Sequence, residues 1–133
     1  MKLDVAPLTG ITVVALEHAI AGPLCTKQLA DLGARIIKIE RPQTGDFARA
    51  YDTRTLGQSS HFIWTNRGKL SLSLDIKSSM GINILKRLLK ESDVLLQNLA
   101  PGAAKRLGLD YATLHSQLPQ LIVCDISGYG QTG

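Results

Sequence analysis

The feature that most constrains the fold is an alternation of short apolar runs with segments of helical periodicity. Residues 11–16 (ITVVAL) are apolar and rich in β-branched side chains, as is typical of a strand buried on both faces. Cys25, Leu29 and Leu32 then recur at helical spacing, and residues 35–40 (RIIKIE) form the next strand-like run. Strand, helix and strand within about 30 residues predict a βαβ unit with a right-handed crossover between parallel strands.

The alternation continues through the rest of the chain. Residues 69–75 (KLSLSLD) alternate as a third strand, with Leu70, Leu72 and Leu74 on one face. Ser78 is positioned to cap a helix, and its expected apolar stripe consists of Met80, Ile84, Leu85, Leu88 and Leu89. Residues 93–98 (DVLLQN) and 121–127 (LIVCDIS) predict two more strands, and Asp110 is positioned to cap a shorter helix between them.

These elements predict an α/β fold: a doubly wound, mainly parallel sheet with helices on both faces, formed by residues 1–133 as one unit. Residues 41–67 lack periodicity and are predicted to be a long loop, which in a compact domain is usually functional or disordered. In such sheets ligands bind beyond the carboxyl ends of the strands. The loops that follow the strands are therefore the candidates for chemistry.

Composition and charge argue against several classes of protein. The net charge is +4 with 15 scattered Lys and Arg residues and no long run of like charge, which disfavours a nucleic-acid partner. Cys25 and Cys124 form no C-x-x-C pair, which favours reduced thiols over zinc or dithiol chemistry. No apolar stretch approaches 18 residues and the first residues lack a leader pattern, so we expect no membrane partner and a cytoplasmic location.

Four cations follow predicted strands: Arg41, Lys77, Lys105 and Arg106. Each is a candidate phosphate ligand, because strand ends of a parallel sheet meet at one edge. Catalytic and metal constellations are scarce, since His18, His61 and His115 have no spacing that suggests a metal site or a triad. Asp46 and Arg49 are predicted to form an ion pair that orders the long loop.

A nicotinamide site is an alternative interpretation. Glu40 ends the second predicted strand, where a dinucleotide-binding fold places its ribose-binding carboxylate, although it is equally explained as a solvated strand end. Residues 128–133 (GYGQTG) match G-x-G-x-x-G after the fifth strand, but a fingerprint normally follows the first strand and opens a helix. The glycine-rich turn is therefore the favoured interpretation.

Taken together, the loops resemble the N-terminal part of the family III CoA-transferases. The ordered segments that carry the resemblance are AGP (21–23), KIERP with GD (38–46), SLDIK (73–77), QNLAPGAAKRLGL (97–109) and SGYGQTG (127–133). The resemblance implies a Rossmann-like large domain that binds coenzyme A as substrate, with no permanently bound cofactor and no metal. Its implied CoA contacts are Ala19, Ile20, Ala21, Arg41, Leu74, Lys77, Asn98, Leu99 and Arg106.

The family also implies a reaction. An aspartate forms a mixed anhydride and then an aspartyl-CoA thioester, so that CoA passes from an acyl-CoA donor to a carboxylate acceptor. That aspartate is expected beyond residue 133, so this chain is expected to be an inactive N-terminal fragment of a parent enzyme that forms an interlocked homodimer. The α-methylacyl-CoA racemases share this N-terminal pattern, and a racemase parent is an open alternative.

Overall fold

The computed structural model describes residues 5–130. Its elements in chain order are β1 (Thr12–Leu16), α1 (Ala21–Asp31), β2 (Arg35–Glu40), the 3-10 helix η1 (Phe47–Ala50), α2 (Ser60–Asn66), β3 (Lys69–Ser73), α3 (Ser79–Lys90), β4 (Val94–Gln97), α4 (Ala103–Arg106), α5 (Tyr111–Gln117) and β5 (Ile122–Asp125). Each of the five predicted strands is present.

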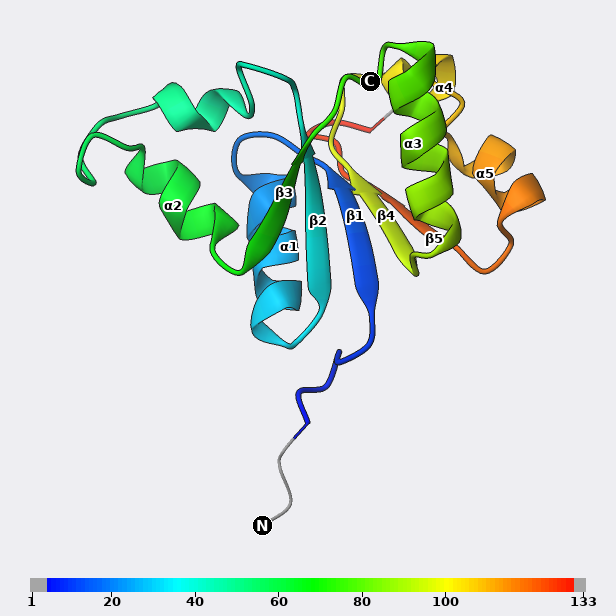
Figure 1. Cartoon of the computed structure of the whole chain (residues 1–133), viewed down its shortest axis with the longest axis horizontal. Coiled ribbons are helices and arrows are strands. Elements are labelled where there is room, and N and C mark those ends of the chain that lie inside the picture. Colours follow the sequence, from blue (N-terminus) through cyan, green and yellow to red (C-terminus); the bar gives the residue numbers. More distant parts are fainter. Residues whose placement is uncertain (1–4, 131–133) are drawn as a thin grey trace.

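The strands form one sheet in the order β3-β2-β1-β4-β5, and every neighbouring pair is parallel (Figure 1). From β1 the chain winds outward through β2 to β3, then returns through α3 to β4 on the other side of β1. The winding direction therefore reverses between β1 and β4, which makes that point the topological switch of the sheet. This arrangement confirms the predicted doubly wound α/β fold.

Helices lie on both faces of the sheet, so that its central strands are buried on both faces. On one face α1 packs against a core cluster of Val13, Ala15, Ala34, Ile36 and Leu96. On the other face α3 and α5 close over the cluster of Val14, Leu16, Ile37, Ile39, Leu85, Leu89, Leu95, Ala104, Leu109, Leu114 and Leu121. The β-branched runs fit these two-sided environments, because their side chains fill both surfaces of a buried parallel sheet.

The predicted apolar helix faces are only partly correct. Leu85 and Leu89 of α3 are fully buried, whereas Met80 is 73% exposed and Ile84 41% exposed. Met80 lies in the first turn of α3, which extends past the carboxyl ends of the strands (Figure 1). Leu32 is 45% exposed because it caps the end of α1 rather than facing the sheet.

The segment from residue 41 to residue 67 is not the structureless loop that the sequence predicted. It contains η1 and α2, each opened by one polar side chain: Asp46 accepts from the Ala48 N–H at 2.9 Å, and Ser59 Oγ accepts from the Phe62 N–H at 3.3 Å. Both helices are short, and Thr65 is the one buried residue of α2. No apolar stripe therefore marks them in the sequence.

The caps predicted for two longer elements are confirmed. Ser78 Oγ accepts from the Gly81 N–H at 3.0 Å at the start of α3, and Asp110 accepts from the Thr113 N–H at 3.2 Å at the start of α5. The four-residue α4 was not predicted; it begins after Gly102, whose φ of 75° is left-handed.

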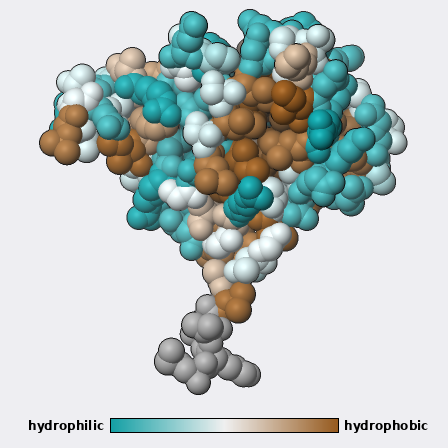
Figure 2. Space-filling model, viewed as in Figure 1, coloured by the Kyte–Doolittle hydropathy of each residue, from teal (hydrophilic) through white to brown (hydrophobic). Residues whose placement is uncertain are grey.

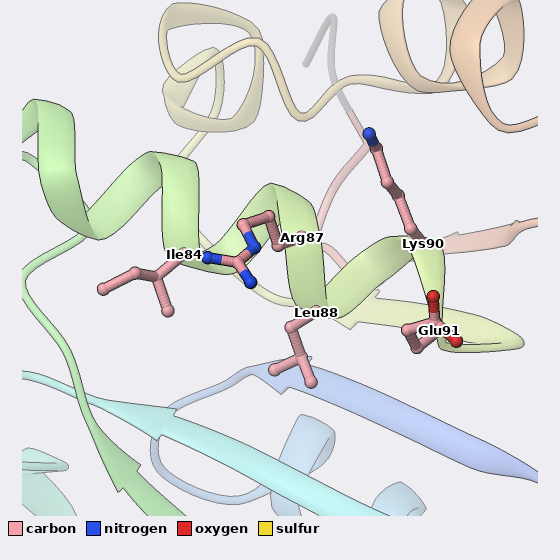
Figure 3. A pocket seen from close by; sticks show the side chains of 5 residues that line it. All are labelled: Ile84, Arg87, Leu88, Lys90 and Glu91. Carbon is pink, nitrogen blue, oxygen red and sulfur yellow. The ribbon is translucent and has the colours of Figure 1, made fainter.

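Some apolar surface is exposed on the face that α3 covers. Leu70 of β3 is 52% exposed, and Figure 2 shows apolar surface over the sheet between β3 and α3. A hollow beside α3 is lined by Ile84, Arg87, Leu88, Lys90 and Glu91 (Figure 3). Across residues 5–130, no helix has both the length and the apolar character needed to cross a bilayer.

Candidate functional site

The carboxyl edge of the sheet is held together at the switch point by Asn98. Its Oδ1 accepts from the His18 N–H at 2.8 Å, and its Nδ2 donates to the His18 carbonyl at 3.0 Å. This pair of hydrogen bonds ties the turn after β1 to the loop after β4. A ligand at the switch point of such a sheet lies between these two loops.

Gly22 permits the close approach of α1 to this junction. A Cβ at Gly22 would lie 2.9 Å from the Glu17 Cβ and 3.2 Å from the Asn98 Cγ, which is closer than side chains pack. The single glycine of the first crossover thus allows the first turn of α1 to sit against β1 and β4. The N-terminal end of α1 is thereby directed at the carboxyl edge of the sheet.

A network of buried charges lies under the same edge, beside β2. The exposed fractions are 0% for Glu17 and 1% for both Lys38 and Asp46. Lys38 Nζ lies 2.7 Å from Asp46 Oδ2 and 3.7 Å from Glu17 Oε1, and Lys69 Nζ lies 2.7 Å from Glu17 Oε1. Burial lowers the pKa of Lys69, and the neighbouring Glu17 carboxylate opposes that shift.

The predicted ion pair between Asp46 and Arg49 is wrong. Asp46 instead pairs with Lys38, and Arg49 pairs with Glu40: Arg49 Nε and Nη2 each donate to one oxygen of that carboxylate at 2.8 Å. Parallel N–H groups of a guanidinium match the two oxygens of a carboxylate, which explains the choice of partner. The long segment is still ordered by ion pairs, and these two join it to strand β2.

Glu40 is neither a solvated strand end nor available to a ribose. The side chain is 5% exposed, and its oxygens accept from Arg49, from the Ser71 hydroxyl at 2.8 Å and from the Asp46 N–H at 3.0 Å. Burial acts to raise the pKa of Glu40, but these hydrogen bonds outweigh it and lower the pKa from 4.5 to about 2. With four donors on two oxygens, the carboxylate has no acceptor site left for ribose hydroxyls.

A hollow of about 290 Å³ opens at the carboxyl ends of β2 and β3. Its lining residues are Glu40, Arg41, Gln43, Thr44, Gly45, Arg49, Ser71 and Ser73. His18, in the turn after β1, has a pKa below its usual value. Burial is the largest cause of this lowering, and the positive charge of Arg41 adds to it. The larger hollow of Figure 3 lies toward the other end of α3, near the amino ends of the strands, where this fold class does not bind ligands.

The residues implied as CoA contacts all lie in the loops at this carboxyl edge or in the helices that follow them. Ala19, Ile20 and Ala21 form the turn into α1, and Arg41 follows β2. Leu74 and Leu99 are half-buried and pack against the core cluster under α3. The side-chain amide of Asn98 is engaged with His18, as described above.

The cations predicted at the strand ends are available for a ligand. Within residues 5–130, Arg41, Lys77, Lys105 and Arg106 make no salt bridge, whereas Lys38, Arg49 and Lys69 are all committed to carboxylates. The Arg106 guanidinium lies against Gly102, at 2.9 Å from the position a Cβ would occupy there. Arg106 is therefore folded back over the loop after β4 at Gly102.

A row of aromatic rings on this edge was not predicted from the sequence. His18, Phe47, Tyr51 and His61 follow one another with centroids 5.6, 5.9 and 5.9 Å apart, and Phe47 is 51% exposed. Three of the four come from the segment without periodicity, so no spacing pattern indicates that they meet. Among the described residues, no group of His, Cys, Asp and Glu could hold a metal ion.

Only part of the GYGQTG motif can be placed. Ser127 Oγ accepts from the Gly130 N–H at 2.9 Å, which closes a turn directly after β5, and Gly130 has a φ of 83°. The last three positions of the motif, 131–133, lie outside the described residues. The described part is consistent with the glycine-rich turn favoured from the sequence.

Comparison with known proteins identifies the family. The model of "CoA-transferase family III" matches residues 8–133. The human protein named succinyl-CoA:glutarate CoA-transferase is 39% identical over 98% of this chain, and acetyl-CoA:oxalate CoA-transferase of Acetobacter aceti is 42% identical over 96%. This chain spans 30% and 33% of the lengths of those two relatives.

Solved structures agree with the sequence relatives. A CAIB/BAIF family protein from Brucella suis superposes with a TM-score of 0.86 at 39% identity, over 96% of this chain and 35% of that one. The protein Rv3272 from Mycobacterium tuberculosis superposes with a TM-score of 0.88 at 36% identity, with the same coverage. The resemblance inferred from the loops is confirmed, and the chain belongs to CoA-transferase family III.

Proposed function

We propose that residues 1–133 are the N-terminal part of the CoA-binding domain of an enzyme that transfers CoA from an acyl-CoA donor to a carboxylate acceptor. The observation that carries the proposal is the junction at the switch point. There Asn98 ties the turn 18–21 to the loop after β4, and the Arg106 guanidinium lies against Gly102 of that same loop. A CoA phosphate needs such cations and backbone N–H groups near one edge of the sheet.

Each implied contact has a physical task in this proposal. Arg41, Lys77 and Arg106 supply charge for the phosphates, and their long side chains reach across the strand ends. Ala19, Ile20 and Ala21 supply backbone groups at the start of α1. Leu74, Asn98 and Leu99 shape the wall of the site, because their side chains are held by the core or by His18.

The carboxylate that forms the aspartyl-CoA thioester is assigned to a residue outside this chain. Asp46 is unsuited to that task, since it is 1% exposed and both of its oxygens accept hydrogen bonds. A nucleophilic carboxylate must reach the thioester carbon, which a buried and fully paired one does not. The parent enzyme is proposed to act as an interlocked homodimer, and this chain alone is expected to show no CoA transfer.

The test is calorimetric titration of the chain with CoA, with dephospho-CoA and NAD as parallel ligands. CoA is expected to bind, more weakly in high salt, and to bind more tightly than dephospho-CoA because one phosphate contact is lost. Arg106→Ala is expected to raise the Kd of CoA roughly tenfold or more. Arg87→Ala is the matched control, because Arg87 lies on α3 in the hollow of Figure 3.

Two results would contradict the proposal. CoA binding that is absent, or that responds equally to Arg106→Ala and Arg87→Ala, would remove the carboxyl edge as the CoA site. Measurable transfer of CoA from succinyl-CoA to a dicarboxylate by this chain alone would show that its nucleophile lies within residues 1–133.

A further inference from the structure

Asp46 is connected to three separate elements at the carboxyl edge. Its Oδ2 lies 2.7 Å from Lys38 Nζ in β2, and its Oδ1 accepts from the Ala48 N–H of η1 at 2.9 Å. The same Oδ1 accepts from the Ala19 N–H at 3.2 Å, across 27 positions of sequence. One buried carboxylate therefore links β2 and η1 to the turn that leads from β1 into α1.

The turn that Asp46 holds is strained. Ala19 has a φ of 61°, in the left-handed region that a residue with a Cβ adopts only at a cost in free energy. Two side chains fix the backbone of this turn: Asn98 accepts a hydrogen bond from the His18 N–H, and Asp46 accepts one from the Ala19 N–H. Ile20 is the N-cap of α1 and makes no side-chain capping bond, so nothing in its own side chain fixes the entry to the helix.

Burying the pair of Lys38 and Asp46 does not by itself stabilise the protein much. Desolvation of two ions offsets most of their mutual attraction, and an apolar pair of similar volume is often as stable. The charge pair does supply a fixed acceptor under Ala19. Lys38 is itself held by the Asn66 Oδ1 at 2.7 Å, so the carboxylate has little freedom to turn away.

We propose that Asp46 is a positioning residue for CoA. Its carboxylate, oriented by Lys38, keeps Ala19 left-handed and so presents the backbone of residues 19–21 in the geometry that binds the ligand. This inference rests on the proposed function, in which those three residues contact CoA. Because folding already places Ala19 in the left-handed region, CoA does not have to force the turn into that conformation when it binds. This preorganisation favours tighter binding.

The test compares two double variants that differ only in the acceptor at position 46. Lys38→Met with Asp46→Asn (K38M/D46N) removes both charges but keeps an amide oxygen for the Ala19 N–H. Lys38→Met with Asp46→Leu (K38M/D46L) removes the charges and the acceptor together. Glu17 keeps its partner Lys69 and the Thr26 hydroxyl in both, so no buried charge is left unpaired.

Titration with CoA should separate the two variants. K38M/D46L is expected to bind CoA roughly tenfold more weakly than K38M/D46N, because its turn relaxes out of the left-handed region. Adding Ala19→Gly to K38M/D46L is expected to recover most of that loss, since glycine adopts positive φ without a penalty. A purely structural role for Asp46 predicts no recovery from a glycine at position 19.

The outcomes distinguish this inference from the function on which it rests. If wild-type protein binds no CoA, the proposed function fails and this inference fails with it. If wild-type protein binds CoA but the two double variants bind equally, or glycine restores nothing, only the inference is overturned. Should K38M/D46L not fold, Ala19→Val tests the same geometry with the charges intact: weaker CoA binding supports the inference, and an unchanged Kd overturns it.

Discussion

The ion pair between Glu40 and Arg49 yields the sharpest prediction about stability. Glu40→Gln keeps the shape of the side chain but removes the charge that the Arg49 guanidinium and the Ser71 hydroxyl surround. The substitution also resembles the protonated form of Glu40. Its effect on the free energy of unfolding therefore has a magnitude and a pH dependence that both follow from the pKa of this carboxyl.

The pKa of Glu40 is about 2 in the folded chain against 4.5 as the reference value, which corresponds to about 3 kcal/mol at about 1.4 kcal/mol per unit. Because the folded pKa is the lower one, this stabilisation is fully present above pH 4.5 and is lost as the pH falls toward 2. Glu40→Gln is therefore expected to destabilise the chain by about 3 kcal/mol at pH 7. The difference should shrink to less than about 1 kcal/mol at pH 2.

Urea denaturation followed by circular dichroism, at several pH values between about 2 and 7, measures this difference. Other carboxylates titrate equally in both proteins, so subtraction isolates Glu40. Glu91→Gln is the matched control, because Glu91 is exposed at the end of α3 and makes no salt bridge within residues 5–130. A destabilisation by Glu40→Gln that stays constant across this pH range would refute the assignment of the lowered pKa to this ion pair.

Three smaller predictions follow from local geometry. Gly81→Ala is expected to destabilise the chain by about 1–3 kcal/mol in urea denaturation, because a Cβ there collides with the Asp75 carbonyl, whereas Gly128→Ala has open space and should change little. Ser78→Ala should cost about 1 kcal/mol through loss of the α3 cap; equal stability with wild type would show that the cap bond contributes nothing. Burial raises the pKa of the Cys25 thiol, so iodoacetamide at neutral pH should alkylate it more slowly than a free cysteine peptide, and an equal rate would contradict that shift.

The sequence predicted the sheet well because each strand is marked by its own residues. Residues 11–16 are β-branched and apolar, and β1 (Thr12–Leu16) is buried along almost its whole length. Residues 35–40 match β2 residue for residue. Five such runs, with a helical pattern in three of the four intervals between them, leave few topologies open, since parallel crossovers are right-handed.

The candidate site was predicted less completely, because its residues act through partners that are distant in sequence. Arg41 and Arg106 could be selected as cations that follow strands, without knowledge of their surroundings. The role of Asn98 depends on His18, which lies 80 positions away and contributes only backbone atoms. No spacing rule indicates a contact between a side chain and a distant main chain.

Two errors of the sequence-based prediction have one physical origin: the structureless loop at residues 41–67 and the ion pair between Asp46 and Arg49. The alternation in residues 35–40 suggests a strand with one wet face, because Lys38 and Glu40 share the face of Ile36. Ile36 on that face packs in the cluster under α1, whereas Lys38 and Glu40 are buried where the segment 41–67 folds back and brings Asp46 to Lys38 and Arg49 to Glu40.

The segment 41–67, whose apolar residues show no period, therefore packs on the sheet by pairing with the buried charges of Lys38 and Glu40 rather than by covering an apolar stripe. A search limited to hydrophobic periodicity misses the segment and the buried charges together. The same logic indicates where to look in other chains of this pattern: a Lys or Glu inside a predicted central strand identifies the loop that must fold back to pair with it.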